Sequence, residues 1–137
     1  MGLTIIQDLG RMLMHVPGAH VDFRDAEMLV TLQLGAGRQQ VVKVFSLKTE
    51  TGGRFVRLQS RAVAIKSHGT VRSALRENCG FGIGGLAMDT SVNPPMLDVI
   101  LSLPVVDLNN DEFLSAIMSV AHYADSIEQR SGGPDQF

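Results

Sequence analysis

The sequence has little cysteine, no tryptophan and no strong excess of charge. Its 137 residues include one cysteine, Cys79, which cannot build a disulfide framework, and the net charge is only −2. No stretch approaches the roughly 20 apolar residues that a membrane helix requires. Asp8 and Arg11 interrupt the apolar start, which argues against a secretory signal. We therefore expect a cytoplasmic protein that does not contact a membrane.

Motifs for metals and cofactors are also missing. The four histidines have no metal-ligand spacing, so we expect no metal site. The stretch Gly80-Phe81-Gly82-Ile83-Gly84-Gly85 matches a dinucleotide-binding fingerprint by letter. That fingerprint needs a strand before it and a helix after it, whereas a short helix is expected before this stretch and a strand within it. We expect no cofactor.

No recognisable catalytic motif is present, and we expect a protein that is not an enzyme. Cys79 beside Gly80 fits a small buried apolar residue better than a nucleophile. Catalytic groups can still meet in space, so an enzyme with a site around Cys79, His68 or His122 remains a further hypothesis.

What is present suits one folded domain. Apolar residues make up 45% of the chain and charged residues 19%, a folding composition. We expect residues 1–130 to form a single domain and residues 131–137, with their Gly-Gly-Pro run, to form a flexible C-terminal tail. Charge is uneven along the chain, since residues 1–77 carry 11 basic and 6 acidic side chains and residues 78–137 carry 1 and 8.

The hydrophobic pattern predicts helices and strands in the order α-β-β-β-β-α-β-β-α. Period-2 alternation marks strands, and apolar residues three and four apart mark helices. This order predicts an α+β fold in which helices pack on one face of an antiparallel sheet. The helices are expected at about residues 5–16, 71–78 and 110–128, and the strands at about 20–24, 28–34, 40–48, 54–65, 81–89 and 96–103.

One polar face of the central hairpin is a candidate site for a partner. If the hairpin register is simple, five side chains share that face: Lys43, Phe45, Phe55, Arg57 and Arg61. Basic residues between aromatic residues can hold a protein segment, and they can also stack and neutralise single-stranded nucleic acid. We rank a dimer or partner surface first, a solvated face second and nucleic acid third.

Two stretches, RQQVVKVFSLKTETGGRFVRLQSRAVAI (Arg38 to Ile65) and SLPVVDLNNDEFLSAIMSVAHYADSIE (Ser102 to Glu128), suggest a family. With the element order, they make the chain similar to the YbjN-like family, which shares the type III secretion chaperone-like fold. The resemblance covers nearly the whole domain and rests on pattern. It implies a bacterial, non-enzymatic homodimer. Secretion chaperones of this fold bind an extended segment of a client protein, and YbjN-like members are regulators.

Together these observations predict a protein-binding module that captures an extended segment of a partner and works as a homodimer. Met96 and Ile100, on the last expected strand, are possible dimer-interface positions. The alternative is a binder of single-stranded nucleic acid, or of another anionic ligand, that uses the basic hairpin face.

Overall fold

The structure is a computed structural model that describes residues 2–78, 80 and 84–131. These residues form three helices and six strands in the predicted order. Their bounds are α1 (Gly2–Leu13), β1 (Ala19–Arg24), β2 (Glu27–Gly35), β3 (Arg38–Lys48), β4 (Arg54–Ala64), α2 (His68–Asn78), β5 (Gly85–Asp89), β6 (Met96–Pro104) and α3 (Asn110–Arg130).

All six strands lie in one antiparallel sheet with the order β1-β2-β3-β4-β6-β5. The first four strands form a meander in which each strand pairs with the next. After α2, the β5–β6 hairpin returns to the sheet with β6 beside β4, so β5 becomes the second edge strand. The predicted α+β architecture is confirmed.

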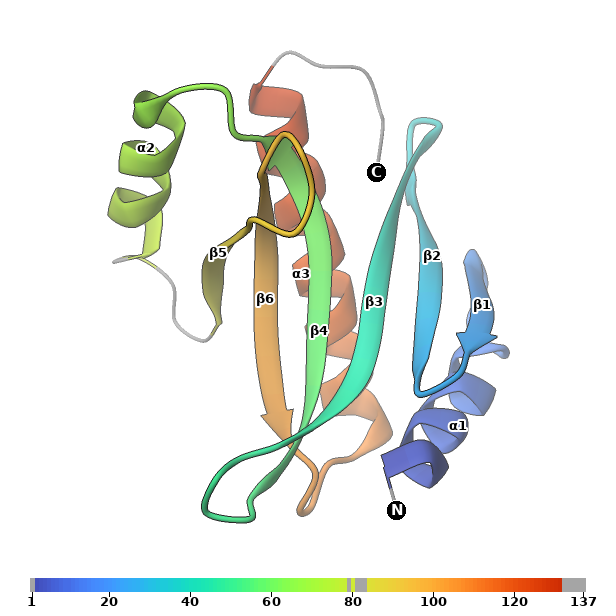
Figure 1. The fold of residues 1–137 in the computed structure, drawn as a ribbon. Coiled ribbons are helices and arrows are strands. Elements are labelled where there is room, and N and C mark those ends of the chain that lie inside the picture. The colour runs from blue at the N-terminus through green and yellow to red at the C-terminus, as the bar shows by residue number, and fades with distance from the viewer. Residues whose placement is uncertain (1, 79, 81–83, 132–137) are drawn as a thin grey trace.

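The helices lie on one side of the sheet, as Figure 1 shows with α3 passing behind the central strands. The long α3 packs across β3, β4 and β6, α1 packs against β1, β2 and β3, and α2 contacts β5. Alternate residues of each strand face this side and are buried, because side chains of a strand alternate between the two faces. The largest buried side chains of this core include Phe113, Ile117, Ile6, Leu13, Met28, Leu32 and Leu58.

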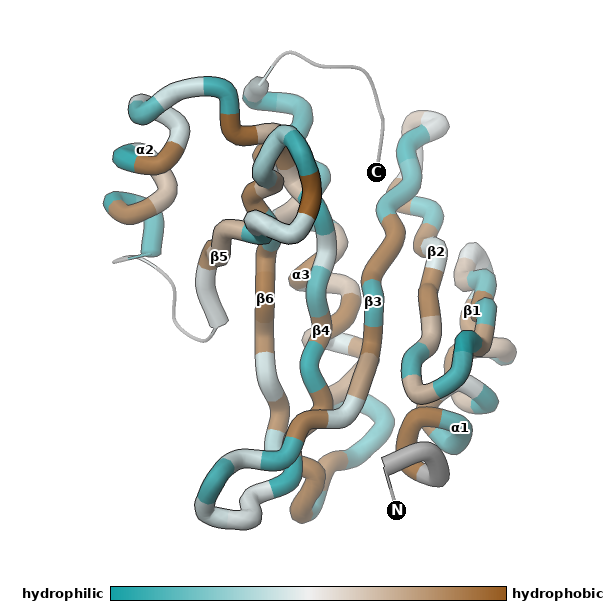
Figure 2. Tube along the Cα trace, in the orientation of Figure 1, coloured by the Kyte–Doolittle hydropathy of each residue, from teal (hydrophilic) through white to brown (hydrophobic). Residues whose placement is uncertain are grey.

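The central strands are therefore apolar on the helix side and mixed on the other. Figure 2 shows β6 hydrophobic over much of its length and the neighbouring β4 alternating between hydrophobic and hydrophilic residues. Val56 and Leu58 are fully buried, whereas Arg57 and Gln59 are partly exposed. Such alternation is typical of a sheet covered on one face only.

Gly10 lets α1 approach the sheet edge closely. A Cβ atom at this position would collide with the ring of Phe23 on β1 and lie 3.1 Å from Sδ of Met28 on β2. The close approach brings Ile6, Leu9 and Leu13 into the core. The missing side chain thus determines how deeply this helix is seated.

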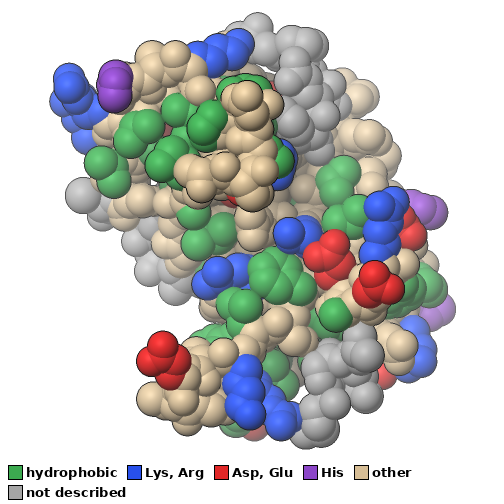
Figure 3. Space-filling model, in the orientation of Figure 1, with side chains coloured by type: hydrophobic (Ala, Val, Ile, Leu, Met, Phe, Trp, Pro, Cys, Tyr) green, Lys and Arg blue, Asp and Glu red, His purple; other side chains and the backbone are tan. Residues whose placement is uncertain are grey.

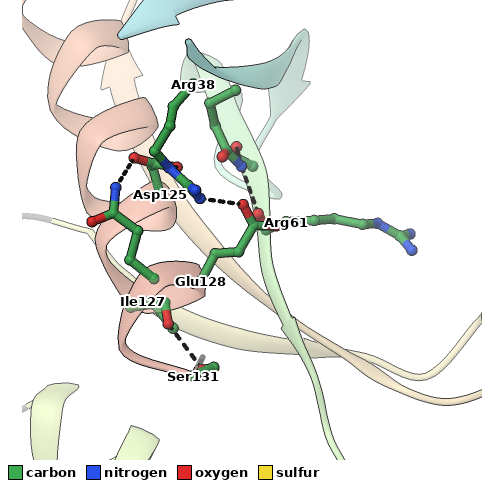
Figure 4. A network of polar contacts seen from close by, with 9 residues as sticks. Arg38, Arg61, Asp125, Ile127, Glu128 and Ser131 are labelled. Carbon is green, nitrogen blue, oxygen red and sulfur yellow. Dashed lines mark hydrogen bonds and ion pairs between the residues drawn. The ribbon is translucent and has the colours of Figure 1, made fainter. Parts of the chain in front are cut away.

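A buried ion-pair cluster ties α3 to the start of β3. Nε of Arg38 donates to Asp125 at 2.8 Å, and a terminal nitrogen donates to Glu128 at 2.9 Å (Figure 4). Asp125 and Glu128 are only 6% and 3% exposed. Beside them, buried Gln40 donates from Nε2 to the Ser60 hydroxyl and to the carbonyl of Arg61. Polar contacts therefore accompany the apolar packing at this end of α3.

Several element ends differ from the expectation. The first helix ends at Leu13 instead of Val16, because the N–H groups of His15 and Val16 donate to carbonyls three residues back and so leave the α-helical pattern. The second helix begins at His68 instead of residue 71. The fifth strand begins at Gly85, and residues 81–83 of the expected strand lie outside the described residues.

The start of the last helix agrees with the expectation. The side chain of Asn109 accepts a hydrogen bond of 2.8 Å from the backbone N–H of Glu112, so Asn109 is the N-cap. The expected tail lies outside the described residues except for Ser131, which caps the end of α3. None of the described helices is long and apolar enough to span a membrane.

Replacing Arg38 with Met should lower the free energy of unfolding by about 3–5 kcal/mol, because it leaves two buried carboxylates without this cation. Denaturant unfolding monitored by circular dichroism measures the change. The exposed pair of Arg11 and Asp8 gives a matched control, since Arg11→Met should cost no more than about 1 kcal/mol. Equal losses for the two variants would contradict a structural role for the buried cluster.

Candidate functional site

The sheet face opposite the helices, here called the uncovered face, holds the five residues predicted to bind a partner. The observed register pairs Phe45 with Arg57, and Leu47 with Phe55. Lys43 precedes Phe45 by two residues and Arg61 lies four residues beyond Arg57, so both share this face. Figure 4 shows the Arg61 side chain pointing away from α3. The simple hairpin register assumed from the sequence is thus confirmed, whereas binding at these residues stays a prediction.

Apolar side chains surround these residues on the uncovered face. Figure 3, which views this face, shows hydrophobic side chains beside Lys and Arg side chains near its middle. Apolar residues project here from β2, β3, β4 and β6, and each is half-buried: Leu29, Val41, Phe45, Phe55 and Ile100. A row of partly exposed apolar side chains on a sheet is a surface on which another chain can pack.

The three basic residues of the set differ in their partners. Arg61 forms an ion pair of 2.8 Å with Asp89. Nε of Arg57 donates to the Ser102 hydroxyl at 3.1 Å, and Nζ of Lys43 lies 5.1 Å from the centre of the Phe45 ring. Within the described part of the chain, neither Lys43 nor Arg57 has a carboxylate at ion-pair distance. Arg61 is therefore neutralised locally, while the other two cations can attract an anionic group.

Asp98 is a buried carboxylate in the floor of the same face, opposite Arg61. It is 1% exposed, and one of its oxygens accepts a hydrogen bond of 2.7 Å from Gln59. Its other oxygen, Oδ1, has no hydrogen-bond partner among the described residues. Burial raises the pKa of Asp98, and the Gln59 hydrogen bond opposes that rise only in part.

Asp89 behaves in the opposite way at the edge of this cluster. Hydrogen bonds from the Ser91 hydroxyl and backbone N–H lower the pKa of Asp89, and the charge of Arg61 lowers it further. The two carboxylates thus have pKa values shifted in opposite directions by their surroundings. The sequence placed Asp98 on the polar side of its strand, but its burial depends on neighbouring strands and no sequence signal indicated it.

The two residues predicted as dimer-interface positions lie on β6. Ile100 is half-buried on the uncovered face, opposite Gln59 of β4 and Gly85 of β5. Met96 is only 6% exposed and offers almost no surface to a second copy. A dimer contact at either residue stays a prediction.

The residues considered for catalysis are not gathered into a site within the described part of the chain. His68 is exposed at the start of α2 and His122 is exposed on α3, whereas Cys79 and its expected burial lie outside the described residues. Over residues 2–78, 80 and 84–131, no group of three His, Cys, Asp or Glu side chains could hold a metal ion. The uncovered face is therefore the candidate site.

Comparison with known proteins adds no family to this picture. No protein-family model matches the sequence, and a search of curated proteins gives no significant match. The candidate site consequently rests on the geometry of the chain itself.

Asp98→Asn should flatten the pH dependence of unfolding. Because the folded protein raises the pKa of Asp98 above its ordinary 3.8, the native state binds this proton more tightly than the unfolded chain does. The free energy of unfolding should therefore fall as the pH rises from about that value through the raised pKa. The variant should lack this fall and be more stable than the natural protein at pH ~7.

The matched control is Asp89→Asn, measured by the same denaturant titrations across pH. Because the pKa of Asp89 is lowered in the native state, its favourable contribution is present at neutral pH and lost on acidification. Asp89→Asn should therefore lower the free energy of unfolding at neutral pH, whereas Asp98→Asn should raise it. A profile for Asp98→Asn that coincides with that of the natural protein would contradict the assignment.

Proposed function

We propose that this protein is a non-enzymatic binding module that holds an extended segment of a partner protein on the uncovered face. One observation carries the proposal: half-buried apolar side chains lie on a sheet face without helices, interspersed with two cations, Lys43 and Arg57, that form no ion pair among the described residues. Burial of apolar surface stabilises the complex but does not select a particular sequence, and the cations add a preference for acidic residues.

The shape of the surface favours an extended segment. A sheet presents side chains in rows about 4.8 Å apart from strand to strand. A segment lying across β3, β4 and β6 can place its apolar side chains against Phe45, Phe55 and Ile100. Acidic residues two positions away from those side chains lie on the same side of the extended segment and can reach Lys43 and Arg57. The preferred partner segment therefore combines aliphatic or aromatic residues with acidic ones.

Single-stranded nucleic acid is the second candidate, because Phe45 lies between Lys43 and Arg57 on neighbouring strands. Such an arrangement can stack a base and neutralise a phosphate. Phe55 is the other aromatic residue of the set, whereas Leu29, Val41 and Ile100 are aliphatic, and bases stack poorly on them. The aliphatic neighbours therefore favour a peptide with apolar side chains over nucleic acid.

A labelled synthetic peptide with Leu and Glu in turn at every second position and Ser between them, here called the Glu-Leu peptide, should bind the protein. Fluorescence anisotropy measures its affinity. Phe45→Ala and Arg57→Ala should each weaken binding at least about tenfold, a loss of ~1.4 kcal/mol. Arg54→Ala is the matched control, because Arg54 is an exposed arginine of the same strand whose side chain alternates to the other face. It should bind the peptide as the natural protein does.

Two competitors separate the candidate functions. A peptide with Lys in place of Glu should not compete, and neither should oligothymidylate at physiological salt. If oligothymidylate binds with a steep salt dependence and the Glu-Leu peptide does not bind, the face is a nucleic-acid-binding surface instead. Unchanged peptide affinity in Phe45→Ala and Arg57→Ala would contradict binding at the uncovered face.

We propose that the protein forms its homodimer through the β5 edge. β5 is an edge strand, and an edge strand can pair with a second copy. Met88 of β5 is 54% exposed, and Leu75, on the neighbouring α2, is 64% exposed. A twofold contact there covers both large apolar side chains and leaves the uncovered face accessible, which a contact at Ile100 would not do.

Met88→Glu should convert the dimer to a monomer, because each of the two copies then places a carboxylate in the apolar contact. Light scattering after size exclusion gives the mass. Met14→Glu serves as the control, since Met14 is 56% exposed at the far end of the fold, just after α1, and it should remain a dimer. A natural protein that is strictly monomeric would refute the dimer without deciding whether the peptide binds.

A further inference from the structure

A second concave surface lies on the helix side of the sheet, between β6 and α3. Its cavity volume is about 960 Å³, within the range of small-molecule sites. Among the described residues, β5 pairs with β6 only from Met96 to Ile100 while β6 continues to Pro104, and the groove lies beside this unpaired part of β6. We call this cavity the β6–α3 groove.

The floor of the β6–α3 groove is apolar. β6 contributes Val99, Leu101 and Leu103, and α3 contributes Ala116 and Val120. Ser115 and Ser119 also line it, and both are exposed. Small side chains on this side of α3 keep the space open along the helix. From Asp111 to Tyr123 the lining spans about 18 Å, at the rise of an α-helix.

The rim of the groove is acidic. Asp111 and Glu112 line one end, and within the described part of the chain neither forms an ion pair. Glu77 lines the other end, where it accepts hydrogen bonds from Arg130 and from the Tyr123 hydroxyl. None of the described lining residues is Lys or Arg. The groove therefore combines an apolar floor with uncompensated negative charge at one end only.

Asp111 and Glu112 also favour helix formation, because acidic residues in the first turn interact well with the helix dipole. That role alone does not require an open apolar cavity beside them. Three carboxylates, Glu77, Asp111 and Glu112, line the groove. A ligand that enters it therefore meets negative charge.

We propose that the β6–α3 groove binds an elongated apolar molecule with a positively charged end, such as a long-chain amine. The hydrocarbon lies along Leu103 and Tyr123, the half-buried members of the lining, and the charged end lies at Asp111 and Glu112. Apolar burial supplies the affinity and the two carboxylates supply the orientation. Most of this site lies on the other side of the sheet from the uncovered face, and Ile100 is the residue that borders both.

Dodecylamine and dodecanoate form a matched pair of probes, because their chains are equal and their charges are opposite. Isothermal titration calorimetry below the concentration at which micelles form should show one dodecylamine bound per chain. Dodecanoate should bind at least tenfold more weakly. The double variant Asp111→Asn, Glu112→Gln should lose most of this discrimination, and it keeps the Asn109 cap because that cap bonds the backbone of residue 112.

Ser119→Phe should fill the groove and weaken dodecylamine binding at least tenfold. Ser126→Phe is its control, because Ser126 is an exposed serine of α3 outside the groove lining. Unfolding curves of both variants check that each is folded. Phe45→Ala should bind dodecylamine normally, which separates this site from the peptide surface.

Equal affinity for the two amphiphiles, or undiminished binding by Ser119→Phe, would overturn the proposal. A basic amphipathic peptide that saturates the groove where dodecylamine fails would also overturn it and assign the groove to a protein partner.

Discussion

The packing of α3 against one face of the sheet is the interaction on which the rest of the structure depends. Its apolar side chains, from Phe113 to Ile127, cover alternate residues of β3, β4 and β6. Because side chains of a strand alternate, covering one set leaves the other set on the opposite surface. The core and the uncovered face therefore both follow from the alternation of side chains along β3, β4 and β6.

Buried charged side chains lie on both sides of the sheet. On the helix side, Arg38 holds Asp125 and Glu128 at the end of α3. On the other side, Asp98 lies beneath the polar groups of β4 with one oxygen unpaired among the described residues. A buried carboxylate without full compensation costs stability. The first arrangement fixes the helix on the sheet, and the second places a carboxylate with a raised pKa in the floor of the candidate site.

Much of the architecture could be predicted from the sequence, because the patterns involved are local. Alternation over β2, β3, β4 and β6 predicted the strands and their faces, and apolar residues three and four apart predicted α3. The shared face of Phe45 and Arg57 followed from a short hairpin loop whose register is simple.

The remaining features depend on contacts between distant segments. The burial of Asp98 requires β4 and β5 on both sides of β6, and Arg38 meets its carboxylates about 90 residues along the chain. The β6–α3 groove lies beside the part of β6 that β5 does not pair among the described residues, and hydrophobic periodicity does not encode this difference in length. Helix ends were displaced where backbone turns compete with the pattern, as at Leu13.

Methyl resonances offer the most direct test of the account, because neighbouring residues on one strand report on opposite faces. With the Glu-Leu peptide added to the protein, the methyl signals of Leu29, Val41 and Ile100 should shift, while those of Val42, Val44 and Leu58 should stay nearly unchanged. Shifts confined to the buried set or to Leu103 in the groove, with the signals of the uncovered face unmoved, would contradict the claim that this face receives the partner.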